Sequence, residues 1–234
     1  MKLLTIDTSS VTACCGVVDT QADKILSECF TDVPLTHSQT VLPMVEAALS
    51  HAGMTFAEVE AIAVCSGPGS FTGVRIGVAA AKGLGFERDL PCASVSTLEA
   101  LAQNVSGVPT DAVVCAVMDA RCRQVYTATF SCDGGVITRL TADEAKSIDD
   151  LTQELLALGR PILLVGDGAL LCETAMKDKL AVTAAPSPLR FVRARGMALA
   201  ATEDRFVTAS ALQPTYLRLP QAERELKARQ ALKG

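Results

Sequence analysis

The chain has 234 residues, of which 49% are hydrophobic, so it is long enough for one large domain or two small ones and too apolar to be disordered. Its formal net charge is -5, it contains no Trp and only two Tyr, and it has no dense block of Lys and Arg. This composition argues against a protein that grips RNA by itself, and any RNA is expected to be held by a partner.

The first elements are a strand hairpin and a helix. Lys2–Asp7 and Ala13–Asp19 are predicted strands joined by a polar turn, and Lys24–Thr31 is a third strand. A helical pattern runs from about Thr36 to Ala52, and Pro43 is expected to kink this helix or to end its irregular first turns.

A glycine-rich turn and a long helix follow. Ala61–Ser66 is a compact apolar strand that leads into Gly67–Ser70 and then into a helix that ends near Phe86. Pro91–Ser96 is the next strand. Strands separated by helices in this way predict a mainly parallel sheet with an antiparallel hairpin at its start.

The same order of units recurs in the second half of the chain. Ala112–Asp119 and Arg121–Phe130 form a second predicted hairpin, and Pro161–Val165 leads into Gly166–Gly168 and a helix. The repeat predicts a duplicated α/β fold with two related lobes. Two lobes around a cleft are the layout of actin-like and sugar-kinase-like phosphotransferases, a likeness that bears on the fold alone.

Two further helices are expected near the C-terminus. Leu189–Arg205 has the pattern of an amphipathic helix, with Arg193 and Arg195 on its solvated face. The tail Gln221–Lys233 mixes acidic and basic residues and is expected to be an exposed helix.

The cysteines and the N-terminus indicate a cytoplasmic protein. Nine cysteines occur with irregular spacing and without a Cys-x-x-Cys pair, so we expect buried side chains in a reducing compartment and no zinc site or disulfide framework. Asp7 interrupts the first apolar run too early for a signal peptide. No apolar stretch approaches the roughly 18 residues of a membrane span, so no membrane contact is expected.

The glycine-rich turns allow two interpretations. Backbone N–H groups at a helix N-terminus suit an anion, whereas glycine and proline can also shape a tight turn without any ligand. The turn matches neither of the common phosphate-binding patterns, which favours the structural interpretation. A vestigial nucleotide pocket would be lined by residues of the hairpin and glycine turns: Asp7, Ser9, Gly67, Gly69, Gly166 and Gly168.

Small residues recur every four positions along the helix behind the first glycine turn: Gly73, Gly77, Ala81 and Gly85. Glycine costs about 1 kcal/mol relative to alanine inside a helix, so this stripe predicts the close approach of another helix. Val74 and Val78 lie beside the stripe. The spacing leaves open whether the neighbour belongs to this chain or to a partner.

Five short blocks are distributed over nearly the whole chain: Asp7–Ser9, His37-Ser38, Gly67–Arg75, Met118–Arg121 with Val125-Tyr126, and Pro214–Arg218. Together these blocks resemble the TsaB (YeaZ) family of tRNA threonylcarbamoyladenosine (t6A) biosynthesis proteins. The resemblance implies a duplicated, two-lobed actin-like fold of the ASKHA (ribonuclease H-like) type. It implies a first lobe over residues 1–108, a smaller second lobe over 109–212, and a C-terminal segment, 213–234, that packs back toward the first lobe.

The same resemblance implies a non-catalytic subunit that scaffolds and activates an enzyme. It implies a heterodimer with the related catalytic subunit TsaD and recruitment of the ATPase TsaE. The complex would transfer threonylcarbamoyl from threonylcarbamoyl-AMP to adenosine 37 of tRNAs that read codons beginning with A, and tRNA would be bound only through the complex. A homodimer stays open, because a surface that meets a homologous partner can also meet its own copy.

In this family the partner interface is a helical bundle of the first two helices of the first lobe. The resemblance therefore assigns nine residues to the partner interface: Val41, Val45, Leu49, Gly73, Val74, Gly77, Val78, Ala81 and Gly85.

The chain lacks the metal ligands of the catalytic relative. TsaD carries a His-x-x-x-His pair where this sequence has Thr97 and Leu101, and neither side chain can replace an imidazole ligand. His37 and His51 are the only histidines, and on one helix they would lie about 21 Å apart, too far to share a metal. We therefore predict no metal, no cofactor and no catalytic residue.

The alternative function is a small ATP-dependent phosphotransferase of the actin-like superfamily with reduced phosphate motifs. The hairpin turns that begin at Asp7 and Asp119 lack the glycine that lets an actin-like backbone approach a phosphate. Both aspartates are then expected to be turn residues that accept hydrogen bonds from their own backbone.

Overall fold

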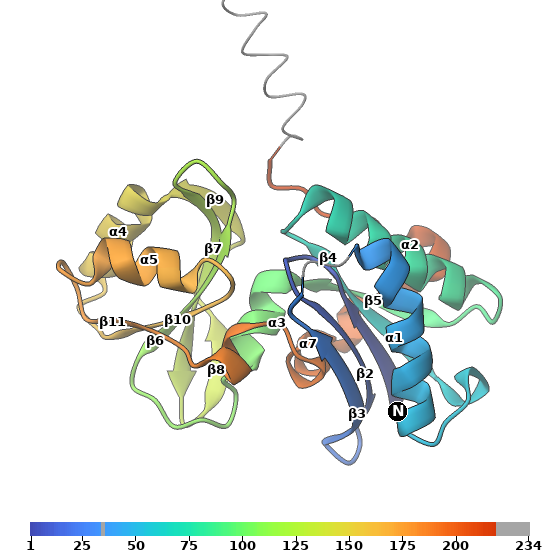
Figure 1. Ribbon diagram of the computed structural model, residues 1–234. Coiled ribbons are helices and arrows are strands. Elements are labelled where there is room, and N and C mark those ends of the chain that lie inside the picture. The colour runs from blue at the N-terminus through green and yellow to red at the C-terminus, as the bar shows by residue number, and fades with distance from the viewer. Residues whose placement is uncertain (34–35, 219–234) are drawn as a thin grey trace, which may run out of the picture.

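The computed structural model describes residues 1–33 and 36–218, which form two lobes that lie side by side (Figure 1). The first lobe begins with β1 (Lys2–Asp7), β2 (Ala13–Asp19), β3 (Lys24–Thr31), α1 (His37–His51), a 3-10 turn (Phe56–Glu58), β4 (Ala61–Gly67), α2 (Phe71–Phe86), β5 (Pro91–Ser96) and α3 (Thr97–Gln103). The second lobe contains β6 (Val113–Asp119), β7 (Gln124–Asp133), β8 (Val136–Arg139), β9 (Glu144–Ser147), α4 (Ile148–Ala157), β10 (Ile162–Val165), α5 (Ala169–Met176), β11 (Val182–Ala184) and α6 (Ser187–Arg190). The chain then continues through α7 (Ala194–Ala200), a 3-10 turn (Glu203–Arg205), β12 (Phe206–Thr208) and a last 3-10 turn (Ala209–Ala211).

The first sheet combines an antiparallel hairpin with parallel strands, in the order β12-β5-β4-β1-β2-β3. β1 pairs antiparallel with β2, where Ile6 lies opposite Cys15, and parallel with β4, where Ile6 lies beside Val64. The nearly continuous apolar sequences of β1, β2 and β4 suit strands that are buried on both faces. The predicted parallel sheet with a hairpin at its start is confirmed.

The second sheet repeats this plan in the order β11-β10-β6-β7-β8, and β9 also pairs with β7. β6 and β7 form the antiparallel hairpin, and β10 runs parallel to β6 as β4 runs parallel to β1. Each lobe therefore has a hairpin, a parallel strand, a glycine turn and a helix in the same order. The predicted duplication is confirmed.

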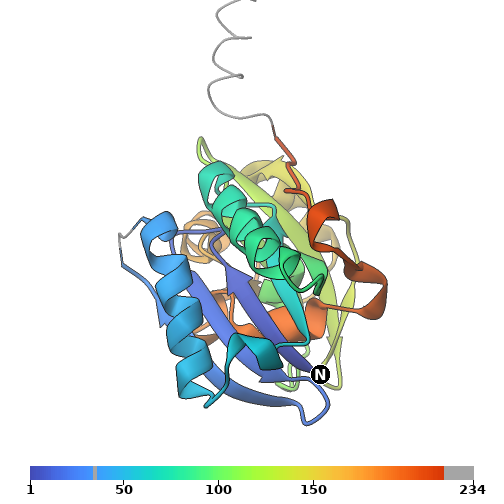
Figure 2. The same ribbon diagram turned by 90° about the vertical axis from the view of Figure 1, so that its right-hand side faces the viewer.

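Helices cover both faces of the first sheet. α1 and α2 lie side by side on its outer face, where Val45 and Val78 pack against the hairpin strands (Figure 2). α3 and α7 cover the other face, and α3 also contacts the second sheet, so that Leu98 and Phe130 belong to one apolar cluster. α4 and α5 cover the remaining face of the second sheet. The two lobes thus share a core.

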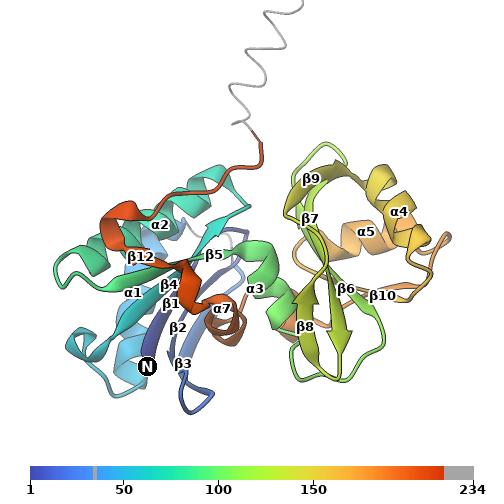
Figure 3. The same ribbon diagram turned by 180° about the vertical axis from the view of Figure 1, so that it is seen from behind.

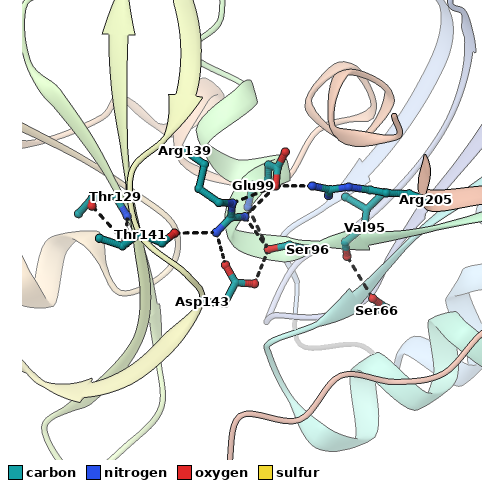
Figure 4. Close-up of polar contacts among 9 residues, drawn as sticks. All are labelled: Ser66, Val95, Ser96, Glu99, Thr129, Arg139, Thr141, Asp143 and Arg205. Carbon is teal, nitrogen blue, oxygen red and sulfur yellow. Dashed lines mark hydrogen bonds and ion pairs between the residues drawn. The ribbon is translucent and has the colours of Figure 1, made fainter. Parts of the chain in front are cut away.

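A cluster of polar side chains joins the lobes beside α3 (Figure 4). Arg139, at the end of β8, donates hydrogen bonds to Glu99 at 2.8 Å and to Asp143 at 2.6 Å. Arg205 donates to the same Glu99 carboxylate at 2.8 Å, and the Ser96 hydroxyl donates to Asp143 at 2.6 Å. Burial alone would raise the pKa of Glu99, but the two arginines hold it below its ordinary value. The two lobes are therefore joined by these ion pairs in addition to the shared core.

The boundary predicted at residue 212 for the second lobe is wrong. β12 pairs antiparallel with β5 at the edge of the first sheet, with Phe206 opposite Ala93. Met197 of α7 belongs to the cluster beneath that sheet. The chain therefore returns to the first lobe at α7, because both elements bury their apolar side chains there.

The single helix predicted over Leu189–Arg205 is divided into α6 and α7. Arg193, expected on a solvated face, donates to Glu28 of β3 at 2.8 Å, and the N–H of Ala194 donates to the same carboxylate at 2.7 Å. A carboxylate from a distant strand therefore sets the start of α7. The predicted helix Gln221–Lys233 lies outside the described residues.

The small-residue stripe of α2 packs against this chain itself. A Cβ at Gly73 would collide with the carbonyl oxygen of Thr8, and one at Gly77 would lie 2.6 Å from Thr8 Oγ1. Thr8 Oγ1 in turn donates to the carbonyl oxygen of Gly73 at 2.7 Å. A Cβ at Gly85 would lie 2.9 Å from the side chain of Cys92. The stripe therefore packs against the hairpin turn and the sheet. The spacing had predicted a second helix at this position, and that prediction is wrong.

Two predictions from composition can be compared with the structure. The prediction that most cysteines are buried is confirmed, since only Cys29 and Cys122 of the nine are not. Among the helices of residues 1–33 and 36–218, none is both long enough and apolar enough to cross a membrane.

Candidate functional site

A cavity of about 310 Å³ lies in the cleft between the lobes. It is bordered by the two hairpin turns, the first glycine turn and the C-terminal segment: Ser9–Val11, Pro68–Phe71, Met118–Arg121, Tyr126, Asp167 and Thr215–Arg218. Of the six residues predicted to line a vestigial nucleotide pocket, Ser9 and Gly69 border this cavity.

The turn of the first hairpin is held by its own aspartate. The carboxylate of Asp7 accepts the N–H of Ser9 at 3.0 Å and the Ser9 hydroxyl at 2.6 Å. Asp7 is fully buried, its Oδ2 has no hydrogen-bond partner within the described residues, and burial raises its pKa. The predicted role of Asp7 as a turn residue is confirmed, and its carboxylate does not face the cavity.

The turn of the second hairpin has the same design. The Asp119 carboxylate accepts the N–H of Arg121 at 2.7 Å, as predicted for a turn residue, and the N–H of Asp119 donates to Asp167 at 3.1 Å. Burial raises the pKa of Asp167 to about 6. The second hairpin turn and the second glycine turn thus place two carboxylates, those of Asp119 and Asp167, at one wall of the cavity.

Three consecutive residues of this second turn have left-handed backbone angles. Arg121, Cys122 and Arg123 have φ of 65°, 54° and 55°. The left-handed conformation is unfavourable for L-residues by about 1–2 kcal/mol each. Hydrogen bonds from Ala120 N–H to the Gln124 carbonyl and from Ile148 N–H to the Arg123 carbonyl hold the turn in place. The sequence did not indicate this conformation, because none of the three residues is glycine.

The glycine turns are filled by backbone of the same chain. Gly67, with φ of 126°, faces the carbonyl oxygen of Thr215, and Gly166, with φ of 107°, faces that of Val117. A Cβ at either position would collide with that oxygen. These glycines therefore allow protein segments to approach one another, and the space beside them is not available to a phosphate.

The C-terminal segment runs along α2 to the side of the first lobe that faces the second lobe (Figure 3), and its residues Thr215–Arg218 border the cavity. Thr215 N–H donates to the carbonyl oxygen of Ser66 at 2.7 Å. Tyr216 stacks on Phe71, with ring centroids 4.8 Å apart, and accepts a hydrogen bond from Arg75 Nε at 2.7 Å. Arg218 reaches the other lobe and donates to the carbonyl oxygen of Ala120 at 2.9 Å. The sequence placed this segment near the first lobe but did not reveal its contact with the second.

The chemistry of a metal enzyme is not assembled in the described residues. No three His, Cys, Asp or Glu side chains of residues 1–33 and 36–218 come together in a way that could hold a metal ion. Thr97 and Leu101, at the positions of the catalytic relative's histidines, are buried in α3. His37 lies at the start of α1, where its Nε2 contacts the carbonyl oxygen of Ser10 at 2.8 Å, and His51 lies at the other end.

The residues predicted at the partner interface point inward. All nine are buried within this chain: Val41, Val45, Leu49, Gly73, Val74, Gly77, Val78, Ala81 and Gly85. The assignment of these side chains to a surface is therefore wrong, because they fill the space between the two helices and the sheet.

The opposite faces of the same helices are exposed and carry apolar side chains, together with Glu46 on α1. On α1, Leu42 is 48% exposed and Pro43 lies beside it. On α2, Ala79 and Gly83 are exposed, and Phe86 is 75% exposed. The only two charged residues of α2 reach the C-terminal segment: Arg75 binds Tyr216, and Lys82 donates to the carbonyl oxygen of Leu212 at 3.2 Å. The outer face of α2 thus carries apolar side chains that no other segment of residues 1–33 and 36–218 covers.

Comparison with known proteins gives a consistent result. The TsaD family, described as tRNA N6-adenosine threonylcarbamoyltransferase, matches residues 32–222. A protein of Bacillus subtilis (strain 168) named tRNA threonylcarbamoyladenosine biosynthesis protein TsaB is 34% identical over 233 residues, which are 95% of this chain and 96% of that protein. The protein of the same name from Escherichia coli (strain K12) is 39% identical over 133 residues, 57% of this chain and 56% of that protein.

Solved structures show the same relationship. YeaZ from Pseudomonas aeruginosa superposes with a TM-score of 0.77 at 27% identity and covers 92% of this chain and 99% of its own. The (R)-2-hydroxyglutaryl-CoA dehydratase component A of Acidaminococcus fermentans has a TM-score of 0.51 at 14% identity, and covers 86% of this chain and 96% of its own. The second similarity concerns the fold alone, and the predicted duplicated actin-like fold is confirmed.

Proposed function

The chain belongs to the TsaB (YeaZ) family of t6A biosynthesis proteins, and we propose that it is the non-catalytic subunit that scaffolds and activates the threonylcarbamoyl transferase. It forms a heterodimer with a TsaD-like catalytic subunit and recruits a TsaE-like ATPase. The complex transfers threonylcarbamoyl from threonylcarbamoyl-AMP to adenosine 37 of tRNAs that read codons beginning with A. The role in t6A biosynthesis rests on family membership, and the division of labour between the subunits rests on the exposed faces of α1 and α2 and on the buried Asp7.

The observation that carries the proposal is the uncovered apolar face of α1 and α2. Small residues at Ala79 and Gly83 allow a second helix to approach α2 closely, and Leu42 and Phe86 supply apolar area on either side. Exposed apolar side chains of this kind favour a protein partner, and the charges beside them are Glu46 on α1 and Arg75, which is bound to Tyr216. The interface is therefore proposed on the outer faces of the two helices, and the stripe that begins at Gly73 supports α2 from inside.

Three features support a subunit without chemistry of its own. Asp7 is sequestered in its turn, and the glycine turn at Gly67 is occupied by Thr215. Thr97 and Leu101 offer no metal ligand. The reacting groups are therefore assigned to the partner.

The test is an Ala79→Glu variant, with Ala157→Glu at the exposed end of α4 as the matched control. Burying a carboxylate against an apolar helix should weaken binding to the TsaD-like subunit at least 10-fold and reduce threonylcarbamoyl transfer to tRNA. Gel filtration and calorimetric titration measure binding, and thermal unfolding checks that the monomer is intact. The control should behave as the wild type. If Ala79→Glu binds as tightly as the wild type, the interface lies on another surface. If the wild-type chain itself does not bind the TsaD-like subunit, the proposal is wrong.

A homodimer would use the same face and is tested with the same variants. Sedimentation of the chain alone across a concentration series reports self-association. If a dimer forms, Ala79→Glu should dissociate it, and the catalytic subunit should compete with it.

The alternative function is an ATP-dependent phosphotransferase, which the cavity in the cleft favours. Against it stand the burial of Asp7 and the filled space beside Gly67 and Gly166. Calorimetric titration of the isolated chain with Mg-ATP separates the two functions. Micromolar binding with turnover would favour the phosphotransferase, whereas the scaffold requires neither.

A further inference from the structure

A row of arginines crosses the mouth of the cleft from one lobe to the other. Arg75 of α2 binds Tyr216, and two residues later Arg218 binds the carbonyl oxygen of Ala120 in the second lobe. Arg121 follows directly, and Arg123 completes the row at the tip of the hairpin. A chain whose net charge is -5 has thus collected four guanidinium groups along one connected set of contacts.

The last two arginines stand on the turn with left-handed backbone angles. This conformation is unfavourable for all three residues from Arg121 to Arg123, and strain of this kind is found mainly at functional sites. Its effect is to hold both side chains outward, where that of Arg121 is 77% exposed and that of Arg123 is 69% exposed. Nothing in the proposed scaffold function uses this strained turn.

An aromatic platform lies at the other end of the row. The Arg75 guanidinium lies 3.9 Å from the ring centroid of Phe71, and Tyr216, itself 41% exposed, stacks on that same ring. The hydrogen bond from Arg75 Nε to the Tyr216 hydroxyl holds the group in one geometry. Aromatic rings and guanidinium planes of this kind are the surfaces on which unpaired RNA bases stack.

Three carboxylates face the row. Asp119 lies 3.4 Å from Arg121, Asp149 lies 3.5 Å from Arg123, and Asp167 borders the cavity. The two ion pairs are exposed and long, so they add little and leave the guanidinium groups able to bind a phosphate. Four arginines against three aspartates give this region an excess of one positive charge. This small excess can attract the phosphate backbone of a nucleic acid to the cleft. It is too small for the chain to bind a nucleic acid tightly without a partner protein.

From the platform and the row together we infer that the mouth of the cleft binds an unpaired segment of RNA, with one base on Tyr216 and phosphates on Arg121 and Arg123. This rests on the proposed function, in which tRNA is bound by the complex, and it assigns part of that contact to this chain. A basic surface alone would suit an acidic protein as well. The exposed stack is what favours RNA.

The experiment measures the affinity of the heterodimer for substrate tRNA by fluorescence anisotropy at several salt concentrations. The double variant Arg121→Ala/Arg123→Ala should bind tRNA about 10-fold more weakly, and its salt dependence, log K against log salt, should be shallower by about 1.4, or 0.7 for each lost contact with a single strand. Tyr216→Leu should weaken binding about 5-fold or more with the slope unchanged, and Tyr216→Phe should restore most of it.

The matched control is Lys177→Ala/Lys179→Ala, which removes two exposed charges beyond the end of α5 that lies away from the glycine turn. It should leave both affinity and slope close to wild type. An unchanged slope in the arginine variant, or an equal change in the control, would overturn the inference.

Gel filtration of each variant with the catalytic subunit separates this inference from the proposed function. If the arginine variant no longer binds the catalytic subunit but keeps its affinity for tRNA, the arginines contact protein and the inference is wrong. If the wild-type chain forms no heterodimer, the proposed function fails. The same titration on the isolated chain at low salt then still decides whether the arginines contact RNA.

Discussion

Two glycines of α2 have opposite surroundings, although both stand in one helix. Gly73 is pressed against the Thr8 carbonyl oxygen, whereas a Cβ at Gly83 would meet no atom within 4 Å. We predict that Gly73→Ala lowers the free energy of unfolding by about 1–3 kcal/mol, because the hairpin turn must move. Gly83→Ala should raise it by up to about 1 kcal/mol, since alanine favours the helix. Urea unfolding followed by circular dichroism measures both, and a change of the same sign in the two variants would contradict the model of α2 facing its own hairpin.

Asp167 makes stability depend on pH. Its pKa is about 6 in the folded chain and 3.8 without the fold, so its ionisation penalises the folded state fully above about pH 6 and not at all well below pH 3.8. An Asp167→Asn variant keeps an oxygen for the N–H of Asp119 and removes this penalty. We predict that it raises the free energy of unfolding at pH 7.5 by up to about 3 kcal/mol. The gain should shrink as the pH falls toward 4, and a gain independent of pH would show that the carboxylate is not the cause.

Sequence reasoning at the scale of single residues succeeded where the chemistry is local. Asp7 and Asp119 were expected to bind their own turns, and each accepts the N–H of the residue two positions later. The stripe that begins at Gly73 was expected to mark a close approach, and it does. The spacing could not predict which segment packs against the stripe, because a small residue indicates only that some neighbour comes close. The family resemblance then assigned nine residues to a partner interface, and all nine are buried within this chain.

Pro43 stands inside α1, at a position where a helix normally has a backbone donor. The helix runs without interruption from His37 to His51, so the N–H that proline lacks would otherwise donate to the carbonyl oxygen of Gln39. We predict that Pro43→Ala raises the free energy of unfolding by about 1–3 kcal/mol, measured by thermal and urea unfolding. The Pro43 side chain is exposed, so no cavity should offset this gain. If the proposed partner surface is correct, the same variant should bind the catalytic subunit less well, since proline contributes to the apolar face.

Elements with a strong local pattern were predicted to the residue. β1, β2, β3 and β5 have the predicted bounds, because turn residues and charges flank short apolar runs. The helix expected over Leu189–Arg205 was wrong, because Glu28 of a distant strand determines where α7 begins. β8 and β9 are four residues each and were not predicted, since their pairing with β7 comes from the sheet more than from their own sequence.

At the scale of the molecule, the order of units predicted two lobes but not how they are joined. A repeat in the sequence shows that two units exist. It contains no signal that α7 and β12 return to the first lobe, because sheet edges and buried faces are filled by whichever segment reaches them. The shared cluster around Leu98 and the ion pairs of Arg139 likewise depend on contacts between distant segments.

These contacts predict that the lobes unfold together, and the two tyrosines can report on them separately. Tyr126 lies on β7 of the second lobe and Tyr216 stacks on α2 of the first, so Tyr216→Phe and Tyr126→Phe each leave one fluorescent reporter. Both reporters should show the same urea midpoint, because α3 belongs to the core of both lobes. Adding Arg139→Met removes a partner from Glu99 and Asp143 while keeping an apolar chain over Phe130, and it should lower the free energy of unfolding by about 2 kcal/mol in both reporters equally. Midpoints that separate in this variant would show that the ion pairs, and not the shared core, make the two lobes cooperative.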